Sequence, residues 1–260
     1  MKRRDIPAIL YHKVTPEWEV GVTWVTPTSF KRQMLRIADE GWKTILPGNG
    51  AILESKIPDY RFQILFDDAY ECVYRYAFPI LEELGYKATV FVPTGYLGRW
   101  NEWDHGLLGR KFRHMDLNML RELANAGWMV GAHSVSHQAL TDLCEADLFF
   151  ELNDSKKYLE DILGRNVEWL AFPFGKYDNT VIRMAVKTGY KGAYIPVSMS
   201  IEPPEDFCLL KADAIYKWDS AGQVVSLLNR DSGYAIAQSI RNAANSLNNG
   251  TIIWRKLFDR

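Results

Sequence analysis

Residues 129–137 read MVGAHSVSH, an apolar run that ends in two histidines four residues apart. The apolar part, Met129–Ala132, is typical of a buried strand, whereas the Ser-Val-Ser between the histidines is a poor strand. In an extended chain the two histidine Cα atoms would lie about 13 Å apart, at roughly 3.3 Å per residue. A turn or helix start at His133 would bring them to about 5–6 Å, where two imidazoles can share a metal ion. The motif alone leaves two interpretations open, a metal site or an ordinary hydrogen-bonded pair.

Short apolar strands and helical segments alternate on both sides of this stretch, a pattern typical of repeated β-α units. Several helical segments end in a glycine followed by an aromatic residue, as at Gly127-Trp128, which indicates a left-handed glycine after the helix. Strands are expected at Ile6–Tyr11, Thr44–Leu46, Phe62–Phe66, Ala88–Val92, Met129–Ala132, Glu168–Phe172, Gly192–Ile195 and Cys208–Ile215. Helices are expected from a cap at Thr28 or Ser29 to Gly41, and over Glu71–Leu84, Leu117–Ala126, Ala146–Leu163 and Thr180–Lys187.

Seven or eight such units in 260 residues predict an α/β fold, a distorted (β/α)7-8 barrel, with an open doubly wound sheet as the alternative. No glycine phosphate fingerprint follows a strand, since Gly48-Asn49-Gly50 lacks the third glycine, and this argues against a dinucleotide site. The pattern changes after about residue 217. We therefore expect a barrel domain over residues 1–217 and a C-terminal helical extension over residues 218–260 packed on it, or else in contact with a partner or a membrane surface. The apolar face of this extension comprises Ile236, Ile240, Ala243, Ala244 and Leu247.

Chemically versatile side chains directly follow several predicted strands. His12 follows the first strand, Asp67-Asp68 follows the third, and a Pro173–Gly175 loop follows the sixth. Taken singly, each has an ordinary explanation: a core histidine, a helix N-cap with a solvated neighbour, and a loop start. Because the carboxyl ends of parallel barrel strands gather on one rim, these residues and the 133–137 histidines are expected to meet in one site.

The overall composition excludes several classes of protein. Lys and Arg number 31 against 32 Asp and Glu, so the chain lacks the basic excess of a nucleic-acid binder. The three cysteines are far apart and form no Cys-x-x-Cys pair, which argues against a disulfide framework or a zinc-thiolate site. The apolar stretch near the N-terminus is too short for a signal peptide, and no run is long enough for a transmembrane helix. We therefore expect a cytoplasmic protein, although a start that omits a leader is the alternative.

Together, the Asp-Asp pair after a strand, the His-Ser-x-x-His motif and the Pro-Phe-Gly loop resemble the polysaccharide deacetylases (NodB-type, carbohydrate esterase family 4). The similarity covers roughly residues 6–216. It implies a distorted (β/α) barrel that removes acetyl groups from sugars. It also implies that Asp67 is the general base, and that Asp68, His133 and His137 hold a metal ion, usually Zn²⁺, with another divalent transition metal as the alternative.

The chain departs from the family pattern in its general acid. The family uses a histidine in a Leu-x-His motif near the C-terminus, but no histidine follows His137 here. Leu10–His12 fits the motif at the opposite end, which resembles the permuted branch typified by poly-N-acetylglucosamine deacetylases. The first and last strands of a closed barrel are neighbours, so this arrangement preserves the geometry. The resemblance thus implies that His12 is the general acid.

A second departure is Ala171, which stands where the family has an arginine that orients the base. Lys176 or Lys211 is the candidate replacement. Asp213 is the candidate for the family's fourth-motif aspartate.

Substrate contacts are expected from two loops. A backbone N–H near Phe174 is the candidate donor to the oxyanion. In the long Gly- and Trp-rich segment 95–114, Trp100 and Trp103 either stack on a sugar ring or anchor the loop, Asn101 or Asp104 contacts hydroxyls, and His105 and His114 are expected at the surface. The predicted substrate-binding residues are Phe174, Pro173, Gly175, Tyr70, Trp103, Asn101 and Asp213.

The function that these features predict is metal-dependent hydrolysis of the acetamide of an N-acetylated sugar, with release of acetate. A catalytically inactive carbohydrate-binding domain is one alternative, favoured by the altered third motif. A metal hydrolase of a non-sugar amide is the other. The sequence leaves the sugar, its chain length and the oligomeric state open.

Overall fold

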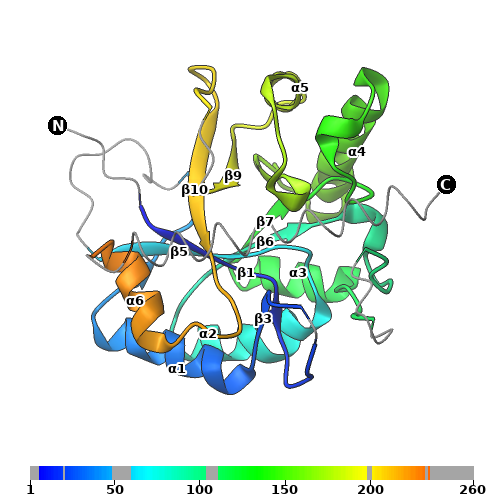
Figure 1. Cartoon of the computed structure of the whole chain (residues 1–260). Helices are drawn as coiled ribbons and strands as arrows, with labels where there is room; N and C mark the ends of the chain where they lie inside the picture. Colours follow the sequence, from blue (N-terminus) through cyan, green and yellow to red (C-terminus); the bar gives the residue numbers. More distant parts are fainter. Residues whose placement is uncertain are drawn as a thin grey trace.

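The computed structural model of the chain describes residues 6–19, 21–48, 60–103, 111–197, 201–231 and 234. Its centre is a closed ring of seven parallel strands (Figure 1). The short strand β4 pairs with the start of β5 outside this ring. In ring order the strands are β1 (Ala8–Tyr11), β10 (Cys208–Ala214), β9 (Gly192–Pro196), β8 (Trp169–Ala171), β7 (Met129–Ala132), β6 (Thr89–Val92) and β5 (Arg61–Phe66), with β4 at Lys43–Thr44.

The ring closes because β1 pairs with strands from both ends of the barrel. Ile9 lies opposite Asp213 of β10 and opposite Ile64 of β5. The distorted barrel predicted from the sequence is therefore confirmed, and the open doubly wound sheet is wrong. Closure also brings the residue that follows β1 next to the residues that follow β5, although they are more than fifty positions apart in the sequence.

Helices cover the outside of the barrel, with α1, α2 and α6 on one side and α4 and α5 on the opposite side (Figure 1). The positions of α1, α3, α4 and α5 agree with the helices expected from the sequence. The predicted left-handed glycines are also present, for example Gly85 at φ 67° and Gly127 at φ 91°. The helices are α1 (Pro27–Asp39), α2 (Phe78–Glu83), α3 (Leu117–Asn125), α4 (Glu145–Leu163), α5 (Asn179–Lys187) and α6 (Ala221–Asn229).

Two helix predictions need correction. The N-cap of α1 is Thr26, whose side chain accepts from the Ser29 N–H, because Pro27 at the first helical position needs no acceptor for an N–H. The helix predicted over Glu71–Leu84 contains a π-helical stretch, η1 (Val73–Ala77), before α2. Pro79 lies just after this stretch, and a proline lacks the N–H that a regular helix would use there.

Helix α6 lies within the segment expected to be a helical extension, although its own bounds were not predicted, and a small second sheet was not expected. A capping box at Ser220 and Gln223 begins α6, which packs on α1. The second sheet pairs β2 (Lys13–Val14) with β3 (Trp24–Val25). The apolar helical face predicted over 236–247 lies outside the described residues, so the limits of the C-terminal extension stay a prediction.

Strand β5 shows how the barrel separates its two apolar layers. Phe62, Ile64 and Phe66 face the helices, whereas Leu65 packs inside the barrel, as expected when successive side chains alternate between faces. Inside, the hydroxyl of Tyr194 donates to Gln63 Oε1 at 2.7 Å. The alternation holds the barrel rigid below its carboxyl rim.

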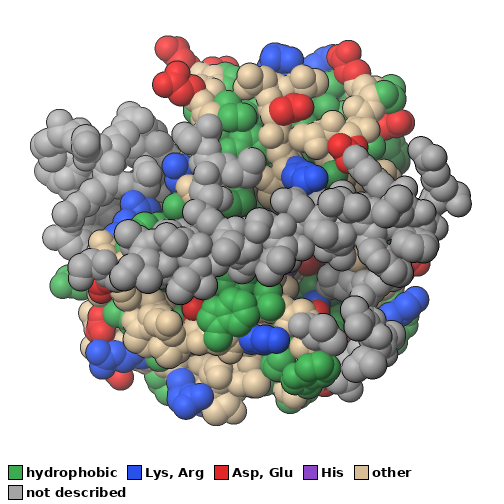
Figure 2. All heavy atoms as spheres, viewed as in Figure 1, with side chains coloured by type: hydrophobic (Ala, Val, Ile, Leu, Met, Phe, Trp, Pro, Cys, Tyr) green, Lys and Arg blue, Asp and Glu red, His purple; other side chains and the backbone are tan. Residues whose placement is uncertain are grey.

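Within the described residues, no helix has the length and apolar character needed to cross a bilayer. On the face shown in Figure 2, Lys and Arg side chains are interspersed with Asp and Glu among apolar groups. This mixture agrees with the formal net charge of −1.

Candidate active site

Asp68, His133 and His137 converge at the carboxyl ends of the barrel strands. Asp68 follows β5 and His133 follows β7. Nε2 of His137 lies 3.1 Å from Oδ1 of Asp68, and Nε2 of His133 lies 3.5 Å from the same oxygen. All three side chains are buried, and their ligand atoms lie within 4.8 Å of one another. The turn proposed at His133 thus forms and gathers the three residues predicted as metal ligands.

The protonation of His133 suits a ligand. Its Nδ1 lies 2.8 Å from the carbonyl oxygen of Ala171. Because a carbonyl only accepts, Nδ1 carries the proton and the lone pair of Nε2 faces Asp68. Burial, followed by the neighbouring His137, lowers the pKa of His133 to about 3. The imidazole is therefore neutral at neutral pH, which is the form that binds a metal.

The carboxylate of Asp68 is ionised. Burial alone would raise its pKa, but His137, His133 and His12 together lower it below the usual range. The site thus combines one anionic oxygen with neutral nitrogen at His133.

The donor set fits a divalent transition metal. Two ligands of a tetrahedral zinc ion, each about 2.0–2.1 Å from it, lie roughly 3.3 Å apart. The two distances from Asp68 to the histidines are close to this value. Three protein ligands also leave one position open, as in catalytic rather than structural zinc sites.

Asp67 lies beside this group with different chemistry. Its N–H donates to the carbonyl of Tyr11 at 3.0 Å, which ties the end of β5 to the end of β1. Burial, followed by the charge of Asp68, raises the pKa of Asp67 well above its usual range. Its Oδ1 is buried and has no hydrogen-bond partner among the residues that the structure describes. Two adjacent carboxyl groups with opposite pKa shifts are typical of sites in which one group transfers protons and the other stays ionised.

His12 reaches the same site from the first strand of the barrel. It directly follows β1, and its charge lowers the pKa of both Asp68 and His133. Such an effect requires His12 to lie near the site. The convergence expected from the sequence is therefore found for His12, Asp67, Asp68, His133 and His137, while their chemical roles stay predictions.

Strained backbone is concentrated at this site. Among the described residues, six other than glycine have positive φ, and five of these are Asp68, Ala69, Ser134, His137 and Phe174. Such conformations cost about 1–3 kcal/mol each and persist where the surroundings enforce them. The surrounding contacts therefore hold the loops in one arrangement.

The Pro173–Gly175 loop forms one wall of the site. Phe174, at φ 58°, has its ring 4.7 Å from that of His137 in an edge-to-face contact. Pro173 is buried, and Gly175 lies against Pro196. The loop is thus positioned for the substrate contact that the sequence predicts.

Three other predicted substrate contacts are buried and have partners inside the protein. Trp103 stacks on His137 with 4.0 Å between ring centroids. Tyr70 stacks on His114, and the side chain of Asn101 accepts from the N–H of Phe112 at 2.7 Å. These contacts favour the loop-anchoring explanation. By contrast, Trp100 is 56% exposed.

Asp213 is buried on β10, where the hydroxyl of Tyr234 lies 3.4 Å from its Oδ2. Neither Lys176 nor Lys211 forms an ion pair with Asp67 within the described part of the chain, so the expected replacement for the family's arginine is not found. Ala171 instead contacts the site through its main-chain carbonyl, which accepts a hydrogen bond from Nδ1 of His133.

His114 is a functional candidate that the sequence reasoning missed. It was expected at the surface, but it is 1% exposed, and its Nδ1 lies 2.6 Å from the carbonyl oxygen of Asp68. The available signal was the aromatic content of segment 95–114, since Tyr96 and Trp103 pack against the His114 ring. His105 and Asp104 lie outside the described residues.

Comparison with known proteins agrees with this geometry. A family profile described as polysaccharide deacetylase matches residues 56–193, more than half of the chain. The chain belongs to this family. The match includes both the Asp67-Asp68 pair and the two-histidine turn.

The curated relatives share about a quarter of their aligned residues with this chain. The protein YxkH of Bacillus subtilis is 26% identical over 193 residues, which is 73% of this chain and 64% of the relative. The poly-beta-1,6-N-acetyl-D-glucosamine N-deacetylase of Staphylococcus aureus is 26% identical over 159 residues, or 58% of this chain and 52% of the relative. The chain thus spans less than two thirds of the length of either relative.

Two solved structures illustrate the similarity in fold. The deacetylase PplD of Streptococcus pyogenes, in complex with acetate, superposes with a TM-score of 0.69 at 23% identity, covering 86% of this chain and 97% of that one. IcaB of Ammonifex degensii superposes with a TM-score of 0.70 at 20% identity, again covering 86% and 97%. At this identity the likeness supports the barrel fold.

Proposed function

We propose that this chain is a metal-dependent deacetylase that hydrolyses the acetamide of an N-acetylated sugar and releases acetate. The observation that carries the proposal is the buried group of Asp68, His133 and His137 on the barrel rim, with Asp67 and His12 beside it. Family membership and the name of the Staphylococcus aureus relative support an N-acetylated sugar as the substrate.

Asp68, His133 and His137 would hold the metal, most simply Zn²⁺. When bound, the ion supplies Lewis-acid polarisation of a carbonyl group and activation of water. The neutral imidazole of His133 is ready for this role, because its Nδ1 proton is engaged by Ala171. The ring of Trp103, stacked on His137, limits the orientations open to that ligand.

Asp67 would take the proton from the attacking water. A carboxyl group whose pKa is raised is, once ionised, a stronger base for this step than an ordinary aspartate. The unpartnered Oδ1 of Asp67, within the described residues, leaves an oxygen available for the water.

His12 would give a proton to the departing nitrogen. An amine leaves an acyl carbon readily only when it is protonated, so hydrolysis needs an acid on the side of the sugar. The main-chain N–H of Phe174, a residue whose ring borders that of His137, is the proposed donor to the oxygen that becomes negatively charged.

The deciding experiment measures metal content and acetate release together, on the wild type and on His133→Ala. We expect wild-type protein to release acetate from N-acetylated chitooligomers, and the variant to lose both metal and activity. A variant that keeps both would show that the ligand assignment is wrong.

The same assay separates the alternatives. Binding of chitooligomers without acetate release would indicate a carbohydrate-binding domain. Faster turnover of simple acetamides or formamides than of chitooligomers would indicate a non-sugar amide hydrolase.

A further inference from the structure

The turn that carries the two histidines is held by hydrogen bonds on two sides. On one side is the short 3-10 segment η2 (Thr94–Tyr96). The Thr94 N–H donates to the carbonyl of Ser134 at 3.1 Å, and the Gly95 N–H donates to the carbonyl of Val135 at 2.9 Å. Within the turn, the His137 N–H donates to the Ser134 hydroxyl oxygen at 3.0 Å. These bonds use the carbonyl groups of Ser134 and Val135, and they do not involve the N–H groups of Val135 and Ser136.

Both remaining N–H groups donate to one side chain on α4, the carboxylate of Glu151. Oε2 of Glu151 accepts from Val135 N at 2.7 Å and from Ser136 N at 2.9 Å. Its Oε1 accepts from the Ser136 hydroxyl at 2.5 Å. Glu151 is only 4% exposed although it lies in the middle of a surface helix. Three donors from two consecutive residues therefore converge on one buried carboxylate.

This carboxylate has no cationic partner among the described residues, since none of their lysines or arginines forms an ion pair with it. A buried carboxylate is costly unless it is hydrogen-bonded. Here the compensation comes from the turn, through charge-assisted bonds that are stronger than those between neutral groups. The position of the turn and the burial of Glu151 consequently depend on each other.

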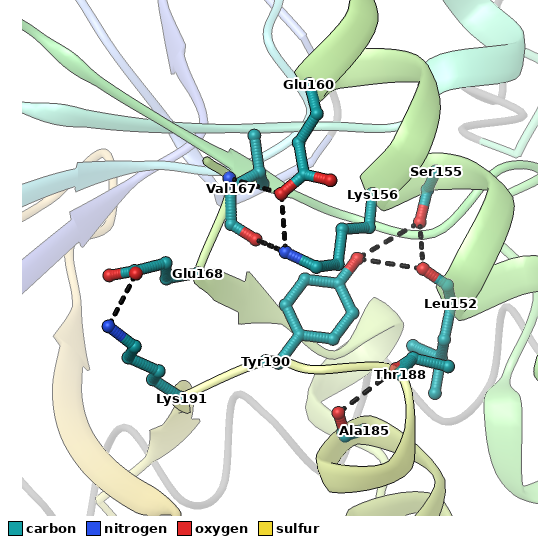
Figure 3. Close-up of polar contacts among 10 residues, drawn as sticks. All are labelled: Leu152, Ser155, Lys156, Glu160, Val167, Glu168, Ala185, Thr188, Tyr190 and Lys191. Atoms are coloured by element: carbon teal, nitrogen blue, oxygen red, sulfur yellow. Dashed lines mark hydrogen bonds and ion pairs between the residues drawn. The ribbon is translucent and has the colours of Figure 1, made fainter. Parts of the chain in front are cut away.

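Helix α4 is itself held by hydrogen bonds at Leu152 and Lys156 (Figure 3). The hydroxyl of Tyr190 donates to the carbonyl of Leu152 at 3.0 Å, and Ser155 Oγ donates to the carbonyl of Glu151 at 2.7 Å. One turn further on, Lys156 Nζ donates to the carbonyl of Val167 at 2.6 Å. Glu151 therefore projects from a helix that is clamped to its neighbours, and can transmit that rigidity to the turn.

We propose that Glu151 is the positioning residue of the two-histidine turn, and that the hydrogen-bonding end group of its side chain, at its full length, sets the metal affinity of the site without touching the ion. This inference rests on the metal site of the proposed function. The two N–H groups that donate to Glu151 belong to Val135 and Ser136, between the histidines. A shift of these two residues therefore displaces both imidazoles relative to Asp68. Second-layer partners of metal ligands commonly affect affinity by 10- to 100-fold.

Three substitutions separate geometry from charge. Glu151→Gln keeps the length of the side chain: its Oε1 can accept from both N–H groups, and its Nε2 can donate to the Ser136 hydroxyl. Glu151→Asp keeps the charge but is one methylene too short to reach both donors. Glu151→Ala removes the acceptor entirely.

The measurement is the dissociation constant for Zn²⁺, by chelator competition, with Co²⁺ absorption as a spectroscopic check of coordination. We expect Glu151→Gln to bind Zn²⁺ within about threefold of the wild type, and Glu151→Asp and Glu151→Ala to bind about 10- to 100-fold more weakly. A folded Glu151→Asp or Glu151→Ala protein with wild-type affinity and an unchanged Co²⁺ spectrum would overturn the proposal. If Glu151→Ala does not fold, the comparison of Asp with Gln decides alone.

Glu160→Gln is the matched control on the same helix (Figure 3). Glu160 also accepts a main-chain N–H, from Val167 at 3.0 Å, and pairs with Lys156, but it lies away from the turn. Its substitution should leave the Zn²⁺ affinity unchanged. If Glu160→Gln lost as much Zn²⁺ affinity as Glu151→Ala, any disturbance of α4 would be enough to weaken binding, and the specific role of Glu151 would be overturned. Wild-type protein that binds no metal would instead refute the proposed function.

Discussion

Nδ1 of His114 lies 2.6 Å from the main-chain carbonyl oxygen of Asp68. Since a carbonyl oxygen can only accept, Nδ1 carries the proton and donates it. The ring is buried and stacks on Tyr70 with 4.8 Å between centroids. The bond therefore fixes the main chain of Asp68 where it adopts its positive φ of 68°. It supports the proposed metal ligand through its main chain and leaves the carboxylate unobstructed.

The first prediction concerns this bond. His114→Phe keeps a ring in the stack but leaves the Asp68 carbonyl without its donor, which should destabilise the protein by about 1–3 kcal/mol. Zn²⁺ affinity should fall by about 10-fold or more, because the ligand loses its support. Urea unfolding with a chelator present and Zn²⁺ competition titration measure the two effects.

Tyr74→Phe is the control for His114→Phe, because it removes an exposed hydrogen bond, from Tyr74 to Glu122, away from the site. It should leave Zn²⁺ affinity unchanged. Normal affinity in His114→Phe would exclude a supporting role for His114.

A second prediction tests the ligands through stability. Zn²⁺ at about 100 times its dissociation constant should stabilise the wild type by about 2.7 kcal/mol. His137→Ala removes one of the three proposed ligands, so Zn²⁺ should no longer raise its melting temperature. Calorimetry with and without Zn²⁺ measures this. Equal stabilisation of both proteins would place the metal elsewhere.

Much of the barrel could be predicted from the sequence, because its strands are short apolar runs and its helices end in glycines that tolerate positive φ, such as Gly127. The bounds of helix α6 were not predicted, although Ser220 and Gln223 form a capping box, because residues 218–260 were expected only as one helical extension. The small sheet β2–β3 has just two residues per strand, too few for any periodicity to be recognised.

The proposed ligands could be singled out because their residue types and spacing are distinctive, whereas the residues that support them could not. Glu151 lies 16 positions from Val135, and His114 lies 46 positions from Asp68. Nothing local in the sequence signals that a helical glutamate or a loop histidine turns inward to bind main-chain atoms. Such roles depend on tertiary packing, which is why His114 was expected at the surface.

A third prediction concerns pH. The pKa of His133 is lowered to about 3 by burial and by His137, whereas an unfolded histidine titrates near 6.5. Between these values the unfolded chain binds a proton that the folded chain does not, so stability from this group is complete above about pH 6.5 and falls as the pH falls. From about pH 6.5 to 5, metal-free wild type should lose about 1.6 kcal/mol more than His133→Asn.

Asp67 contributes with the opposite sign, because its raised pKa lets the folded protein keep a proton that the unfolded chain releases. It is present in both proteins, so the difference between them isolates His133. Urea unfolding at several pH values, with a chelator present, is the measurement. Parallel pH profiles would contradict a buried neutral His133.

A fourth prediction separates the two adjacent aspartates. Asp67→Asn keeps the size of the side chain but cannot take a proton, so the rate of acetate release should fall by about 10²- to 10⁴-fold. Zn²⁺ content should stay at the wild-type level, because the proposed ligand is Asp68. Loss of Zn²⁺ from Asp67→Asn would show that the two roles are reversed.

The last prediction approaches the two-histidine turn from the side opposite Glu151. A Cβ atom at Gly95 would lie 2.7 Å from the carbonyl oxygen of Val135, closer than such atoms approach, and that oxygen also accepts the Gly95 N–H. Gly95→Ala must therefore push the turn away from η2, and Zn²⁺ affinity should fall by about 10-fold or more even though every ligand is intact. Gly222→Ala in α6 is the control, because its new Cβ would meet nothing within 4 Å and it should leave Zn²⁺ affinity unchanged. If Gly95→Ala binds Zn²⁺ as the wild type does, the turn has enough freedom to bind metal without its main-chain contacts, and the rigidity inferred from its hydrogen bonds is not what determines affinity.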